Sequence, residues 1–167
     1  MRRTFLVLTW RELYGEMRIG VDFGGVIVRS LTEGAVLEPG LGLQLEQPDA
    51  LDCLRRLVKI TAGQCWIISK ASRSTQAATR EWLGAIDFYK RTTFLSSNLV
   101  FCAKRSEKRG LCRELGISHF VDDSREVIES LVGIVPNLAL FASTEVVHGA
   151  ENIPNWKALM ALWLDKN

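Results

Sequence analysis

Three carboxylates in this sequence follow apolar segments that suit buried strands. Asp22 follows residues 18–21 and precedes a turn with two glycines, and Asp122 and Asp123 follow residues 117–121. Carboxylate oxygens are ligands that Mg²⁺ prefers, and an aspartate can also attack a phosphoryl centre. The pattern therefore predicts a divalent-metal site in which Asp22 is a candidate nucleophile.

Two further features fit phosphoryl chemistry. Ser69 ends the apolar segment 65–69 and offers a hydroxyl group. The glycine N–H groups that follow Asp22 can bind phosphate oxygens. A lysine between Ser69 and Asp122 would balance the negative charge of the carboxylates and of the substrate.

The elements that must position these residues alternate between strand and helix patterns. The expected strands are residues 18–23, 65–69, 98–102, 117–121 and 137–141. The expected helices begin at Asp49, at Ser74 or Thr75, at Glu107, at Arg125 and after Pro154, with the first two starts assigned to N-caps. This alternation predicts a three-layer α/β/α, Rossmann-like domain with a parallel sheet of about five strands.

The carboxyl ends of such strands form the usual ligand site of a parallel sheet. Asp22, Ser69, Asp122 and Asp123 all lie at such ends in the predicted arrangement. Their convergence carries more weight than any one of them, because Asp122 and Asp123 alone also suit a turn and helix start. Asp22 alone equally suits a strand-to-turn junction.

Composition places the chain among ordinary globular proteins. The 167 residues are 47% hydrophobic and 24% charged, with a net charge of +2, which gives no clear nucleic-acid signal. We expect one domain over residues 17–167 and an N-terminal extension over residues 1–16. No apolar run has the length of a membrane span, and four cysteines without a C-x-x-C pair favour a reducing, cytoplasmic location.

Four marks in order resemble the haloacid dehalogenase-like (HAD) hydrolase superfamily, whose members are mostly Mg²⁺-dependent phosphatases. They are Asp22-Phe23-Gly24-Gly25-Val26, the strand ending in Ser69, a lysine before the last motif, and Val121-Asp122-Asp123-Ser124. The resemblance runs from about residue 17 to about residue 143, and the order and strand context of the marks make it moderately specific.

The resemblance implies roles for individual residues. Asp22 would be the nucleophile, and Lys108 the site lysine, with Lys104 as the alternative. Mg²⁺ would be held by Asp22, the Gly24 carbonyl, Asp122 and Asp123. Phosphate would be bound by Phe23, Gly24, Gly25 and Ser69. The expected ligand is a phosphorylated small molecule or macromolecule.

Gly24 departs from the family pattern. The phosphatases of this superfamily have an aspartate two positions after the nucleophile, which acts as general acid and then base, a contribution typically worth ~10²–10⁴ in rate. Without it, the protein would use leaving groups that need little protonation, recruit another acid, or follow a chemistry without that step. The alternative is a non-catalytic module that binds a phosphoryl ligand or a protein.

No long insertion occupies the usual cap positions of the family. Residues 29–48 could form a small flap at most. An uncapped site would be open, which suits a bulky or macromolecular substrate, or closure by a second copy of the chain in a homo-oligomer.

Overall fold

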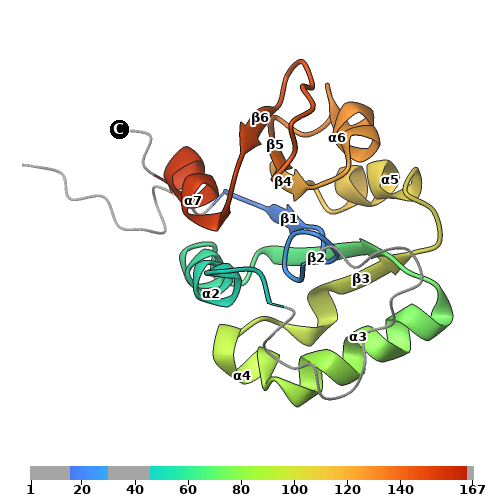
Figure 1. The fold of residues 1–167 in the computed structure, drawn as a ribbon, viewed down its shortest axis with the longest axis vertical. Helices are drawn as coiled ribbons and strands as arrows, with labels where there is room; N and C mark the ends of the chain where they lie inside the picture. Colours follow the sequence, from blue (N-terminus) through green and yellow to red (C-terminus); the bar gives the residue numbers. More distant parts are fainter. Residues whose placement is uncertain (1–15, 30–45, 165–167) are drawn as a thin grey trace, which may run out of the picture.

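The computed structural model of this protein describes residues 16–29 and 46–164. Strands and helices alternate along these ranges (Figure 1). The strands are β1 (Ile19–Val21), β2 (Cys65–Lys70), β3 (Leu99–Cys102), β4 (His119–Asp122), β5 (Asn137–Phe141) and β6 (Glu151–Ile153). The helices are α2 (Ala50–Ile60), α3 (Arg73–Ala85), α4 (Phe88–Thr92), α5 (Glu107–Glu114), α6 (Arg125–Leu131) and α7 (Trp156–Leu164), with the 3₁₀ helix η2 (Ser96–Asn98) before β3.

The six strands form one parallel sheet in the order β3-β2-β1-β4-β5-β6. The chain builds one half outward from β1, then crosses back to place β4 on the other side of β1. This reversal is the topological switch point at which parallel sheets bind ligands. The predicted fold class is confirmed, although β6 adds a sixth strand. It has only three residues, two of them exposed, and no apolar run that would reveal it.

Both faces of the sheet are covered by helices, as the apolar strands predict. Alternate residues of each strand enter different cores: Val121 packs with α2, α3, α4 and α7, whereas Phe120 packs with α5 and α6. Figure 1 shows α5 and α6 on the opposite side of the sheet from α2 and α4. The period of two along β4 therefore produces the three layers. Every helix within the described ranges is too short or too polar to cross a bilayer.

Of the two predicted N-caps, Asp49 is confirmed in position and the second needs correction. Helix α3 begins earlier than expected, because the Ser72 hydroxyl, and not Ser74 or Thr75, accepts the capping hydrogen bond, from the Thr75 amide at 3.2 Å. Asp49 is the N-cap residue of α2 as predicted, but its backbone is left-handed (φ 63°) and its side chain makes no capping bond. The Asp49 carboxylate instead pairs with Lys157 at 3.4 Å.

Two other predictions fall largely outside the described residues. Only Glu16 of the proposed extension 1–16 is described, and only the ends of the segment 29–48. These ends lie together, because Val28 bridges Glu46 and the Gln47 amide donates to the Ile27 carbonyl at 2.9 Å. The chain thus returns, after residue 45, to the turn that follows β1.

Candidate functional site

The carboxyl edge of the sheet brings the predicted acids together. Strand β1 lies between β2 and β4, with Val21 level with Ile67 on one side and Val121 on the other. Asp22 leaves β1 at this edge, and Asp122 is the last residue of β4. Both follow residues of the α2 core, so the alternation of the strands turns them toward α5.

Helix α5 supplies a buried lysine that joins the two acids. The Lys108 Nζ lies 2.7 Å from Asp22 Oδ1 and 2.7 Å from Asp122 Oδ2. Its side chain is 2% exposed, and those of Asp22 and Asp122 are 11% and 1% exposed. Lys104, the alternative considered for this position, precedes α5 and is exposed. The structure therefore places Lys108 among the carboxylates.

The charges of this site do not balance. Three carboxylates, those of Asp22, Asp122 and Asp123, surround a single ammonium group. Burial and then the charge of Asp122 raise the pKa of Asp22 to about 7, although Lys108 opposes the shift. Burial and Asp122 also raise the pKa of Asp123. Burial alone would lower the pKa of Lys108, but Asp22 and Asp122 outweigh it and the pKa rises.

The donor set fits a hard divalent cation. One ligand atom each of Asp22, Asp122 and Asp123 lies within 4.8 Å of the other two. Lys108 occupies one oxygen of Asp22 and one of Asp122, and Asp122 Oδ1 also accepts the Ser124 amide at 2.9 Å. Oxygen donors of this kind suit Mg²⁺ or Ca²⁺, and two positive charges would neutralise the excess of carboxylate.

The turn after Asp22 requires glycine at one position and leaves the other open. Gly25 is left-handed (φ 79°), and a Cβ there would lie 1.9 Å from the Asp123 Oδ2. The Asp123 side chain therefore packs directly on the turn. Gly24 is exposed, and a Cβ built on it would meet no atom within 4 Å. Position 24, where the phosphatases that the sequence resembles have an aspartate, thus has room for a side chain.

Some amides of the turn that follows Asp22 lack protein acceptors among the described residues. The amides of Ile27 and Val28 both donate to the Phe23 carbonyl, at 2.9 and 3.1 Å. Within the described residues, neither Phe23 nor Gly24 donates its own amide hydrogen to a protein acceptor. Phe23 and Gly24, both predicted phosphate ligands, therefore have N–H groups without a protein acceptor among the described residues. The role of Gly25 is different: its lack of a side chain leaves room for the Asp123 carboxylate.

Ser69 lies at the same edge, but no hydrogen bond within the described residues joins it to the charged cluster. It is 6% exposed and is the penultimate residue of β2. Within the described part of the chain, its hydroxyl forms no hydrogen bond with Asp22, Lys108 or Asp122. The structure thus unites four of the predicted site residues and gives no contact that links Ser69 to them.

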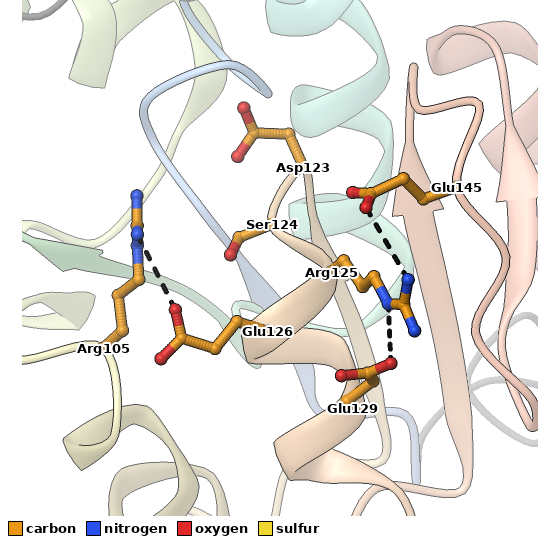
Figure 2. Close-up of a pocket in the computed structure, with 7 residues that line it drawn as sticks. All are labelled: Arg105, Asp123, Ser124, Arg125, Glu126, Glu129 and Glu145. Atoms are coloured by element: carbon orange, nitrogen blue, oxygen red, sulfur yellow. Dashed lines mark hydrogen bonds and ion pairs between the residues drawn. The ribbon is translucent and has the colours of Figure 1, made fainter.

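Asp123 also lines a hollow of about 440 Å³. Figure 2 shows the residues that line this hollow. Two arginines in it are held by glutamates. Arg125 binds Glu129 at 2.7 Å and Glu145 at 3.7 Å, and Arg105 lies 3.8 Å from Glu126. This hollow could not be predicted from the sequence, because its lining comes from three separate segments that no local motif connects.

The comparisons with known proteins agree with the fold and no more. No protein-family model and no curated protein matches the sequence. A protein from Burkholderia xenovorans LB400, named as a haloacid dehalogenase-like hydrolase, matches 73% of this chain at 13% identity and a TM-score of 0.53. This chain covers 59% of that protein. A de novo designed Rossmann 3x3 protein is similar at 14% identity and a TM-score of 0.45, and the match covers 90% of this chain and 97% of the designed chain. The chain therefore has a parallel α/β fold similar to that of a HAD-like hydrolase.

Proposed function

We propose that this protein is a HAD-like hydrolase that transfers a phosphoryl group to Asp22, with Mg²⁺ as its cofactor. The observation that carries this proposal is the buried Lys108 between Asp22 and Asp122, at 2.7 Å from each. An ion pair with a purely structural role needs only one carboxylate for each ammonium group. Two carboxylates on one ammonium, with Asp123 beside them, leave negative charge that a metal and a phosphoryl substrate would use together.

The chain's own residues supply the nucleophile and its orientation. Lys108 holds Oδ1 of Asp22, which leaves Oδ2 to attack. As the Oδ2–P bond forms, the ester O–P bond breaks and the leaving group departs with the bonding electrons. A water oxygen then forms a bond to phosphorus, the Asp22 O–P bond breaks, and the proton of the water passes to solvent.

Mg²⁺, held by Asp22, Asp122, Asp123 and the Gly24 carbonyl, would reduce the repulsion between carboxylate and phosphoryl oxygens. The free amides of Phe23 and Gly24 would donate to those oxygens, with Gly25 giving the turn its shape. Ser69 would add a hydroxyl donor once a ligand is bound.

Gly24 defines the leaving groups that this site can release. With no acid at this position, the leaving oxygen must depart as an anion, so aryl and acyl phosphates should react faster than alkyl phosphates. The test is hydrolysis of an aryl phosphate with and without Mg²⁺. We expect Mg²⁺-dependent turnover in the parent and none in Asp22→Asn. Turnover that survives in Asp22→Asn would overturn the assignment of the nucleophile.

The alternative is a module that binds a phosphorylated ligand without turnover, and the absence of an acid at Gly24 favours it. Gly24→Asp separates the two functions, because the open space there accepts the side chain. A rise in alkyl phosphate hydrolysis would support an enzyme that lacks only the acid. An inactive Gly24→Asp protein that still binds phosphate would support the binding module.

The remaining expectations concern partners and location. The open hollow beside Asp123 supports a substrate that extends beyond its phosphoryl group, in a small molecule or a macromolecule. A second copy of the chain could close the site. All four cysteines are free, which supports a reducing, cytoplasmic location.

A further inference from the structure

The turn that follows Asp22 is held by two side chains from distant parts of the chain. The Trp156 Nε1, on α7, donates to the Val26 carbonyl at 2.8 Å. The Gln47 Nε2 donates to the Gly25 carbonyl at 3.0 Å. Trp156 and Val26 are both 0% exposed, so the first of these bonds is shielded from water. Neither residue belongs to a motif that the sequence analysis connected with phosphoryl chemistry.

The hydrogen bond from Trp156 continues through two peptide groups to an amide at the site. In a planar trans peptide, the C=O and N–H groups point in opposite directions. The Val26 carbonyl accepts from Trp156, and the N–H of the same peptide, that of Ile27, donates to the Phe23 carbonyl at 2.9 Å. The Phe23 carbonyl belongs to the peptide group that joins Phe23 to Gly24. The N–H of that peptide group is the Gly24 amide, which has no acceptor among the described residues.

This series of hydrogen bonds therefore orients the Gly24 amide and also makes its N–H a stronger hydrogen-bond donor. Each bond in such a series polarises the next, so a buried donor at one end raises the donor strength at the other. Gln47 fixes the neighbouring peptide, because its amide holds the Gly25 carbonyl. The turn thus has two anchors, one in the core and one on the chain that returns after residue 45.

We propose that Trp156 and Gln47 are positioning residues that hold the Phe23–Val26 turn so that its free amides receive a phosphoryl oxygen. This proposal rests on the proposed function, since it assigns the residues that shape the same phosphate site. Neither side chain touches the phosphoryl group. Their effect is to keep the Gly24 amide turned outward before the ligand arrives, which lowers the entropic cost of binding.

The same helix provides a matched control. Trp163 is 5% exposed, and its indole nitrogen has no hydrogen-bond partner within the described residues. Trp156→Phe and Trp163→Phe therefore each remove one buried indole from α7, but only the first removes a bond to the turn. Phe keeps a ring at position 156, where Trp156 faces Phe141 with centroids 6.2 Å apart.

The test is calorimetric binding of inorganic phosphate to the full chain in saturating Mg²⁺, with Mg²⁺ binding alone measured separately. We expect Trp156→Phe to weaken phosphate binding by about threefold to tenfold, the loss typical of one hydrogen bond, while Mg²⁺ affinity stays within about twofold. Trp163→Phe should match the parent in both. A purely structural role would weaken both ligands together.

Gln47→Met is the second variant, and it tests the positioning role if Trp156→Phe does not fold. It removes the side-chain donor but keeps the backbone bond to Ile27, and we expect a loss of phosphate affinity of about twofold to fivefold. Phosphate affinity equal to that of the parent in the folded variants would overturn the positioning role alone. A parent that binds Mg²⁺ but no phosphate would instead overturn the proposed function, and the positioning role with it.

Discussion

The two ends of the β1–β4 strand pair carry polar networks of different kinds. At the amino end, Arg18 stacks over Trp66 at 4.6 Å and donates to the Leu115 carbonyl at 2.6 Å and to the Gln64 side chain. Its own amide donates to Ser118 Oγ at 2.9 Å. One cation thus meets only neutral acceptors among these contacts.

At the carboxyl end, one cation pairs with two anions, and a third lies beside them. Lys108 pairs with Asp22 and Asp122, and burial, followed by the charge of Asp122, still raises the pKa of Asp22 and of Asp123. The same pair of strands therefore supports one network of a cation with neutral acceptors and one with an excess of carboxylates. This difference is the basis of our proposal that the carboxyl end binds a charged ligand, whereas the amino end has a structural role.

The largest effect should come from removing the buried cation. Lys108→Met leaves two adjacent buried carboxylates without a partner, so we expect a loss of about 3–5 kcal/mol in the free energy of unfolding. Urea denaturation at neutral pH without metal measures it. The matched control is Lys104→Met, an exposed lysine whose loss should cost at most about 0.5 kcal/mol. Equal costs for the two variants would contradict a special role for the Lys108 position.

The pH dependence of stability should distinguish the carboxyl end in the absence of metal. The pKa of Asp22 rises from 3.8 to about 7 on folding, so the folded protein binds more protons between these values. The stability from this group is complete below pH ~4 and is lost as the pH rises to about 7, by at most about 4 kcal/mol.

Asp22→Asn tests this shift, because the asparagine resembles the neutral aspartic acid at every pH. The stability of Asp22→Asn relative to the parent should therefore increase steadily from pH 4 to pH 7, measured by denaturation in the presence of a chelator. A constant difference over this range would show that the pKa of Asp22 is ordinary.

A smaller effect is expected at the amino end. Arg18→Met removes the donor to Leu115 and Gln64 but keeps apolar contact with Trp66, so we expect a loss of about 1–2 kcal/mol in stability. The pH profile between 4 and 7 and the affinity for Mg²⁺ should match those of the parent. A change in Mg²⁺ affinity would show that the two ends are coupled through β1 and β4.

The smallest expected effect in free energy concerns the metal. Asp123→Asn should weaken Mg²⁺ binding by about tenfold, equivalent to about 1.4 kcal/mol, because it removes one anionic ligand from the cluster. Isothermal calorimetry measures the affinity. Glu126→Gln, in the adjoining hollow, removes the same charge outside the cluster and should leave the affinity within about twofold. Equal losses in both variants would mean that general charge, and not ligation, attracts the ion.

Much of the fold follows from local patterns. The apolar segments that became β1 to β5 and the helical periodicities between them are properties of neighbouring residues, and a parallel sheet with both faces covered follows from their alternation. The positions of Asp22 and Asp122 at strand ends follow as well. The short β6 and the helix α4 could not be predicted, since three to five residues carry too little pattern. The Ser72 cap was missed because Ser74 and Thr75, close by, are equally suitable cap residues.

The sequence by itself determined that three carboxylates would reach one edge of a sheet. Only the tertiary structure decided that Lys108 joins them, that Asp123 packs on Gly25, and that Trp156 bonds to the turn. The physical reason is that strand ends are aligned by the sheet, a repeating structure that the pattern of residues specifies. The point at which a helix side chain meets that edge depends instead on how each crossover packs, which is a property of the whole core.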